Sequence, residues 1–287
     1  MYTSMKVQKD GGVARVVIDN PPLNLLDAAL LCDLDAFITE IGDDETTKVI
    51  IVESADPDFF VAHGDMNFVD DPAAAAAAIQ IAGDQTLNPM LRLHERLRQL
   101  PQITIGKIAG LARGGGSELL LAMDMRFAAI ETAGLAQNEA PIGIIPGGGG
   151  TVYLARLVGR PRALEIILGA RLFDAVTAER YGLVNRALPA AELDEFVDRL
   201  ARRIATLAPG VVSGAVEVVE TALSSHEDGL KAEDDVLFGL FARPAATSLT
   251  RAARAAGAQT RDGERTLEAL LDGLTTDDVV PREAGLL

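Results

Sequence analysis

The sequence contains one short run whose residue types could do chemistry, Gly114-Gly115-Gly116-Ser117-Glu118. A strand-like apolar segment (103–112) precedes it and a helix-like segment (119–125) follows it. Consecutive glycines cost conformational entropy, so they are typical of places where the backbone takes an unusual shape or lets a ligand come close. A helix that begins here would direct free N–H groups and its positive dipole end toward an oxygen that carries negative charge. With Glu118 in the first turn, the run predicts proton transfer beside a carbonyl group.

Other interpretations of this run stay open. Three glycines can simply form a turn, and a glutamate in the first helical turn can simply complement the helix dipole. Ser117 is a candidate nucleophile of a hydrolase because it follows glycines at the start of a helix. A nucleophile elbow, however, needs a glycine two residues after the serine, where this chain has Leu119. We therefore interpret Ser117 as a small packing or helix-start residue.

A second glycine run, residues 147–150, follows a proline, but neither run matches a nucleotide-binding fingerprint. Both lack the Lys-Ser/Thr ending of a P-loop and the third glycine of a dinucleotide turn. The three histidines, His63, His94 and His226, are scattered, and the sequence has no Cys-His cluster. No metal site is therefore predicted.

The elements that must position these residues alternate between strand and helix. Hydrophobic periodicity predicts strands over 13–18, 48–52, 103–112, 125–130 and 183–187, and helices over 28–41, 72–81, 91–100, 119–125, 151–157, 161–168 and 190–207. After residue 210 the pattern is helical to the end. The sequence therefore predicts an α/β part followed by an all-α part, with a boundary near residues 207–214.

Composition narrows the function classes. The chain has 287 residues, 48% of them apolar, and a net charge of −16. The negative charge of the chain is repelled by nucleic acid and by anionic membranes, so neither is an expected partner. The single cysteine, Cys32, excludes an intrachain disulfide, and the first ten residues contain no apolar signal region. Without a long apolar segment, a cytoplasmic location is expected.

Three separated motifs resemble those of the enoyl-CoA hydratase/isomerase (crotonase) superfamily. They are Gly114–Leu119 with the later Asp124, the loop 60–66, and the segment 137–151 with its glutamate, proline and glycines. Two shorter stretches, 20–24 and 178–184, fit as well, so the resemblance covers about residues 13–207. It implies a spiral of repeated strand-strand-helix units over residues 1–207, followed by a C-terminal helical trimerisation region over residues 208–287.

The resemblance also implies a substrate, an assembly and a site. The substrate would be an acyl-CoA thioester, so coenzyme A belongs to the substrate and no separate cofactor is expected. The chain would form a homotrimer or a dimer of trimers. The backbone N–H groups of Gly64 and Gly115 would bind the thioester oxygen, Glu118 would activate water, and Glu139 would exchange a proton at the α-carbon. The residues expected to contact substrate are Phe60, Ala62, His63, Asp65, Met66, Gly114, Pro141 and Gly143.

Several features depart from the family pattern, including three in or near its motifs. His63 stands where the family loop has a glycine, Arg113 replaces an apolar residue, and one extra residue separates Asp124 from Glu139. The resulting hypothesis is an enoyl-CoA hydratase that adds water across the 2,3 double bond. Its alternatives are an enoyl-CoA isomerase, an acyl-CoA thioester hydrolase on the same scaffold, and a non-catalytic acyl-CoA-binding homologue.

Overall fold

A computed structural model describes residues 2–70, 73–74, 76–260, 263, 271 and 273–274. The chain divides into two compact units, Met1–Ala201 and Arg202–Leu287. The division falls between residues 201 and 202, inside a helix, whereas the sequence pattern placed the boundary after residue 207. A helix that continues across the division explains the difference, because hydrophobic periodicity follows the helix and not the contacts around it.

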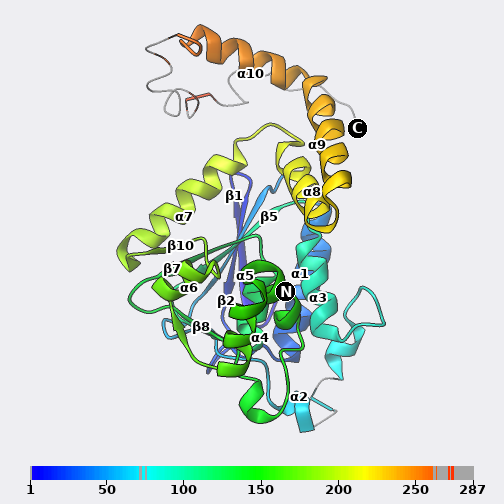
Figure 1. Cartoon of the computed structure of the whole chain (residues 1–287), viewed down its shortest axis with the longest axis vertical. Helices are drawn as coiled ribbons and strands as arrows, with labels where there is room; N and C mark the ends of the chain where they lie inside the picture. Colours follow the sequence, from blue (N-terminus) through cyan, green and yellow to red (C-terminus); the bar gives the residue numbers. More distant parts are fainter. Residues whose placement is uncertain are drawn as a thin grey trace. The chain divides into compact units, whose positions relative to one another are not determined.

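The first unit contains a six-stranded sheet with the strand order β1-β2-β3-β5-β7-β10 (Figure 1). Its strands are β1 (Met5–Asp10), β2 (Val13–Ile18), β3 (Val49–Ser54), β5 (Ile103–Ile108), β7 (Met125–Ala129) and β10 (Arg186–Leu188). Only β1 and β2 are antiparallel; the other neighbours are parallel. The first four residues of β3 are fully buried, as expected for a parallel strand covered on both faces.

A second, four-stranded sheet has the order β4-β6-β8-β9. Its strands are β4 (Phe59–Val61), β6 (Leu111–Arg113), β8 (Gly134–Ala136) and β9 (Phe173–Asp174). Each of β3, β5 and β7 is followed along the chain by a strand of this second sheet and then, directly or after short helical segments, by a longer helix. These helices are α3 (Pro89–Arg98), α4 (Gly115–Leu121) and α5 (Gly150–Gly169). The predicted spiral of strand-strand-helix repeats is therefore confirmed.

The segment 103–112, predicted as one strand, is two strands in different sheets. The chain turns at Gly110, where an added Cβ would lie 2.6 Å from the backbone carbon of Asp58. Only glycine fits so close to another backbone, so the chain can cross from one sheet to the other here. The pattern of apolar residues did not reveal this crossing, because it continues from β5 into β6 without a break.

Helices cover both faces of the larger sheet. Helix α1 (Ala28–Gly42) lies beside α3 (Figure 1). Helix α7 (Ala190–Ala205) packs Phe196 against Phe127 of β7, with ring centroids 5.1 Å apart. From the same helix, Asp194 Oδ1 lies 2.5 Å from Lys107 Nζ, and Asp198 pairs with Arg15. These ion pairs connect α7 to strands β2 and β5 of the sheet.

The shorter helical segments are α2 (Asn67–Asp70), η1 (Ala77–Gln80), η2 (Ala140–Ile142) and α6 (Ala175–Tyr181). The helix predicted over 72–81 is limited to η1 in the described chain, and residues 72 and 75 lie outside the described residues. The two helices predicted over 151–168 are present as the two halves of α5, which are separated by the non-helical backbone of Gly159 (φ 75°, ψ 164°).

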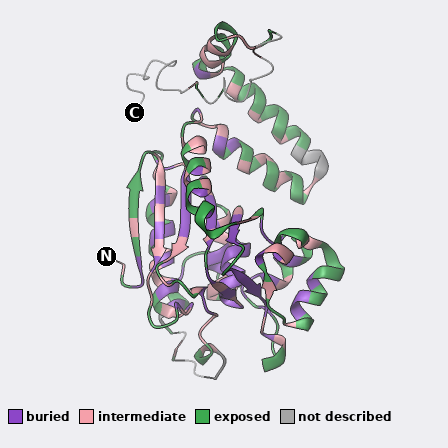
Figure 2. Ribbon diagram, turned by 90° about the vertical axis from the view of Figure 1, so that its left-hand side faces the viewer, coloured by how far each residue is buried: buried purple, intermediate pink, exposed green. Residues whose placement is uncertain are grey.

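The described residues of the second unit are mainly helical, as predicted, and form α8 (Val211–Ser224), α9 (His226–Phe241) and α10 (Pro244–Ala255). Helices α8 and α9 approach closely at Gly214, where an added Cβ would lie 2.6 Å from Val236 Cγ1. Much of both helices is exposed (Figure 2). Their exposed residues include the large apolar ones Val219, Leu223, Leu230, Leu237, Phe238 and Phe241. Across the described residues, no helix has the length and apolar character needed to cross a membrane.

Helix α4 lies at the centre of the first unit, and all seven of its residues are buried. Its glycines permit this position. An added Cβ on Gly116 would lie 2.4 Å from the carbonyl oxygen of Val61 in β4. Helix α4 starts at Gly115, so Glu118 lies in its first turn as predicted, and the glycines admit a neighbouring strand.

We expect Gly116→Ala to destabilise the protein by about 1–3 kcal/mol or more, because the new methyl group meets a rigid backbone carbonyl. Gly169→Ala is the matched control, since an added Cβ at this position of α5 meets nothing within 4 Å. Urea unfolding monitored by circular dichroism measures both. Equal unfolding midpoints for the two variants would contradict the close approach of α4 and β4.

Candidate active site

Two glycine backbones meet at the start of α4. An added Cβ on Gly115 would lie 3.2 Å from both the nitrogen and the Cα of Gly64. Leu26 forms hydrogen bonds with the residues on either side of Gly64: its N–H donates to the His63 carbonyl (2.9 Å), and its carbonyl accepts from Asp65 N–H (3.1 Å). In this parallel bridge the N–H of Gly64 points away from Leu26.

The N–H of Gly115 is also available, because the first residue of a helix has no helical acceptor. The peptide groups that carry these two donors are polarised at their other ends. The His63 carbonyl accepts from Leu26 N–H, and the Gly114 carbonyl accepts from Glu118 N–H, each at 2.9 Å. A carbonyl that accepts a hydrogen bond strengthens the N–H of the same peptide as a donor. Both peptides are therefore polarised as donors, and they lie on neighbouring glycine backbones.

Gly114 shapes the turn that precedes α4. Its backbone (φ 47°, ψ −124°) lies in a region that L side chains rarely adopt. An added Cβ would also lie 2.9 Å from Asn138 Oδ1 and 3.0 Å from Glu139 Oε1. Both the conformation and the neighbouring carboxyl group therefore require glycine at this position.

Glu118 is held by the second glycine run. Its Oε1 accepts hydrogen bonds from Gly148 N–H (2.7 Å) and Gly150 N–H (2.9 Å). Only 2% of the residue is exposed, and burial raises the pKa of its carboxyl group while the two amides oppose that rise. An added Cβ on Gly148 would lie 2.4 Å from Met90 Sδ and 2.9 Å from Glu118 Oε2, so the run brings backbone donors up to the carboxylate.

Glu139, which precedes η2, is the second buried carboxyl group. It is 8% exposed, and its pKa is raised to about 7, first by burial and then by the negative charge of Glu118. In the orientation that satisfies the hydrogen bonds of the Gln137 side chain, the amide nitrogen of Gln137 donates to both carboxyl oxygens of Glu139 at 3.2 Å. The extra residue between Asp124 and Glu139 does not separate the two carboxyl groups, because the charge of Glu118 still acts on Glu139.

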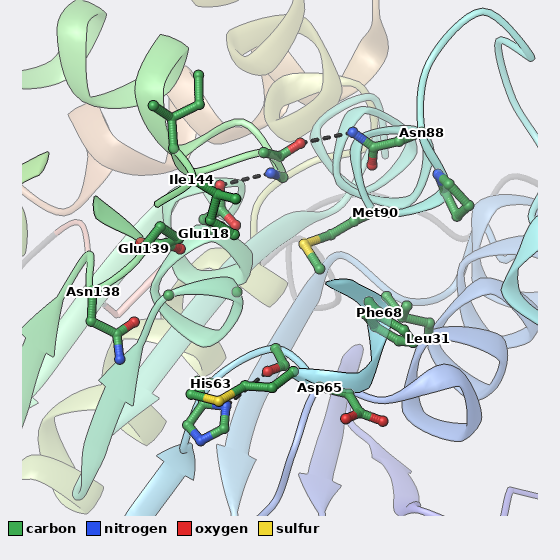
Figure 3. A pocket seen from close by; sticks show the side chains of 18 of the residues that line it. Leu31, His63, Asp65, Phe68, Asn88, Met90, Glu118, Asn138, Glu139 and Ile144 are labelled. Atoms are coloured by element: carbon green, nitrogen blue, oxygen red, sulfur yellow. Dashed lines mark hydrogen bonds between the residues drawn. The ribbon is translucent and has the colours of Figure 1, made fainter. Parts of the chain in front are cut away.

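The two carboxyl groups and the glycine backbones at 64 and 115 open onto a cavity of about 370 Å³ (Figure 3). Its walls carry apolar side chains from several elements: Leu31, Met66, Phe68, Ala78, Met90, Ile142, Ile144 and Ile145. The polar groups that reach it are few and include both carboxyl groups. A mostly apolar cavity with a small set of converging polar groups is typical of a small-molecule site.

The cavity brings together most of the predicted site residues: His63, Gly64, Asp65, Met66, Gly114, Gly115, Glu118 and Glu139. Phe60 and Ala62 do not line it; they are buried in and just after β4, where they pack into the core. Pro141 and Gly143 do not line it either, and both are exposed around η2. Their expected contact with substrate stays a prediction.

The two unusual residues have different surroundings. His63 lies at the cavity, where its Nδ1 is 2.7 Å from the Gly64 carbonyl oxygen (Figure 3). Arg113 does not line the cavity; its guanidinium lies 5.9 Å from the centre of the Phe59 ring. Of the two, only His63 is positioned to contact a ligand.

Sequence reasoning missed the contribution of α3. Asn88, at its N-terminus, donates from Nδ2 to the Gly147 carbonyl (2.8 Å), and His94 Nδ1 lies 2.5 Å from the Gly148 carbonyl oxygen. Neither residue belongs to a glycine or glutamate motif. The only available signal was a histidine within an amphipathic helix, and that pattern is also typical of packing.

Comparisons with known proteins identify the family. The family model described as Enoyl-CoA hydratase/isomerase matches residues 8–251. A Mycobacterium tuberculosis protein named "Probable enoyl-CoA hydratase" is 31% identical over 243 residues, covering 84% of this chain and 91% of the relative.

Solved structures give the same result. A Streptomyces avermitilis protein is 47% identical, with a TM-score of 0.74 and coverage of 94% of this chain and 98% of the other. The enoyl-CoA hydratase of Bacillus anthracis is 30% identical, with a TM-score of 0.80 and coverage of 88% and 96%. This chain therefore belongs to the enoyl-CoA hydratase/isomerase family.

Proposed function

We propose that this protein is an enoyl-CoA hydratase, which adds water across the 2,3 double bond of an acyl-CoA thioester. One observation carries the proposal: two buried carboxyl groups and two available backbone N–H groups open onto the same apolar cavity. The M. tuberculosis and B. anthracis proteins, both named as enoyl-CoA hydratases, support the reaction type.

In this mechanism the thioester oxygen accepts hydrogen bonds from Gly64 N–H and Gly115 N–H. When the oxygen of water attacks C3, the double bond shifts and negative charge develops on the thioester oxygen, forming an enolate. Donors that are already fixed at this position stabilise the charge without reorganising. The adjacent glycine backbones support this role because no side chain separates the two amides.

The two glutamates divide the proton transfers. Ionised Glu118 accepts a proton from water while the hydroxyl group bonds to C3. Protonated Glu139 then gives its proton to C2 of the enolate, and transfer of the proton from Glu118 to Glu139 restores the starting state. The pKa of about 7 for Glu139 supports its role as an acid at neutral pH, since an effective acid has a pKa near the working pH.

The alternatives receive less support from the same site. An isomerase needs one group to move a proton between carbons, whereas two carboxyl groups face this cavity. A Ser117-dependent hydrolase would need that hydroxyl group at the cavity, but Ser117 is buried and does not line it. We also propose that the second unit mediates trimer formation, which the exposed apolar side chains of α8 and α9 support.

Glu118→Gln tests the reaction directly. Because the amide oxygen of glutamine can still accept from the glycine loop, acyl-CoA affinity should stay near wild type while hydration falls by about 100-fold or more. The assay follows the loss of the conjugated-thioester absorbance of a 2-enoyl-CoA, and exposed Glu45→Gln is the control. Unchanged turnover would contradict the role of Glu118. A gain of absorbance from a 3-enoyl-CoA would indicate isomerisation, and thiol release would indicate hydrolysis.

A pair of glycine variants tests the oxyanion site. In Gly115→Ala the new methyl group lies 3.2 Å from the Gly64 backbone and should push the donors apart, whereas in Gly64→Ala it lies 3.7 Å from the flexible Met90 Cε. Loss of one donor costs about 3 kcal/mol, so we expect kcat to fall about 100-fold in Gly115→Ala and much less in Gly64→Ala. Equal kcat values for the two variants would argue against a shared oxygen site.

The raised pKa of Glu139 also predicts a dependence of stability on pH. Its pKa is about 7 when folded and 4.5 when unfolded, so the folded state binds more protons between these values and stability falls as pH rises through this window. Glu139→Gln removes this loss, so its stability relative to wild type should be higher at pH 8 than at pH 4, by about 1–3 kcal/mol once solvent screening of a partly buried group is allowed for. Urea unfolding at both pH values measures it. Parallel curves for the two proteins would show that Glu139 is not held in a charge-disfavouring site.

A further inference from the structure

We propose that Asn88 and His94 of α3 are positioning residues, which fix the glycine loop 147–150 and thereby the orientation and proton affinity of Glu118. The effect on turnover rests on the proposed hydration, but the effect on Glu118 does not. Neither side chain bonds to Glu118 itself; both act through the loop backbone.

Asn88 holds the peptide group that donates to Glu118. The carbonyl of Gly147 and the N–H of Gly148 belong to one peptide. The carbonyl accepts from Asn88 Nδ2 at 2.8 Å, and the N–H donates to Glu118 Oε1 at 2.7 Å (Figure 3). Rotation of this peptide would break both bonds together. The bond to the carbonyl also strengthens the N–H as a donor, because the peptide is polarised along its length.

The next two peptides of the loop are fixed as well. The Gly148 carbonyl lies 2.5 Å from His94 Nδ1, and the Gly149 carbonyl accepts from Tyr153 N–H at 2.8 Å. Helix α5 therefore holds the peptide between Gly149 and Gly150. Asn88 and His94 hold the two peptides before it. Three successive peptides in a glycine-rich segment would otherwise rotate easily.

His94 is kept in one protonation state by its surroundings. The residue is fully buried, and burial lowers the pKa of its imidazole to about 4. A carbonyl oxygen can only accept, so the proton of the neutral ring is on Nδ1. Nε2 has no hydrogen-bond partner among the described residues. Because a buried unpaired nitrogen is costly, packing alone would be better served by an apolar side chain.

Helix α3 has a further bond to the same region. Its Glu95 Oε1 accepts from the hydroxyl group of Tyr153 at 2.5 Å, which links α3 to the start of α5. The titratable groups that influence Glu118 or its loop from neighbouring elements are Glu139, Tyr153 and His94. None of them replaces the hydrogen bonds that the loop gives to the Glu118 carboxylate. Weaker donation from the loop should therefore raise the pKa of Glu118 further.

The test uses Asn88→Ser and Asn88→Asp in the full chain. Asn88 also caps α3, with Oδ1 accepting from Leu91 N–H at 3.0 Å, and both replacements keep a good cap. Aspartate has no donor for Gly147, and the shorter serine side chain should not place its hydroxyl group at the Gly147 carbonyl while it caps α3. The serine variant also adds no charge. We expect kcat to fall about 10- to 100-fold in both, with KM near wild type in the serine variant.

His94 gives an independent pair. His94→Leu removes the donor to Gly148 and should lower kcat to a similar extent, whereas His94→Asn retains an N–H donor and should recover much of the loss. The readout that separates positioning from simple stability is the Glu118 titration. It is followed by NMR of protein with ¹³C-labelled glutamate carboxyl groups and assigned with Glu118→Gln. The Glu118 pKa should rise in Asn88→Ser and His94→Leu and stay near wild type in His94→Asn.

Folded Asn88→Ser and His94→Leu proteins with wild-type kcat and an unchanged Glu118 titration would overturn the proposal. A wild-type protein with no hydratase activity would instead contradict the proposed function. In that case the Glu118 titration in the variants still decides whether α3 sets the proton affinity of this carboxyl group.

Discussion

The site depends on the close approach of two backbones, at Gly64 and Gly115, which leaves no room for a side chain between them. Gly64 follows a strand of the second sheet, and Gly115 begins the helix after the neighbouring strand. Parallel pairing of β4 with β6 therefore brings together two amides that are about 50 residues apart in the sequence. The spiral fold brings the two backbones together, and the glycines allow them to approach closely.

A second constraint is the burial of negative charge. Glu118 and Glu139 lie in an apolar cavity of an already acidic protein, so desolvation opposes the ionisation of each, and the charge of Glu118 further opposes that of Glu139. The loop amides at 148 and 150 offset this for Glu118 only. The two carboxyl groups thus have different environments, which is what separate acid and base roles require. Their titrations are properties of the pair because the charges interact.

Much of this arrangement could be predicted from the sequence. The glycine run and the glutamate after it indicated a helix start with an acid beside it, and the family resemblance implied Gly64 and Glu139. The crossing at Gly110 could not be predicted, because it depends on contact with Asp58 from a distant strand. The same holds for α3: Asn88 and His94 act on carbonyl groups more than 50 residues later, and local periodicity carries no such information.

The carbonyl stretching frequency of a bound 2-enoyl-CoA tests the central claim most directly. Raman difference spectra with a ¹³C-labelled thioester carbonyl, recorded on a variant that binds without turnover, would isolate this one bond. Two N–H donors on the oxygen at Gly64 and Gly115 predict a clear shift to lower frequency relative to the free thioester in water. A frequency equal to or above that of the free thioester would contradict the account, because the oxygen would then have no strong donors in the site.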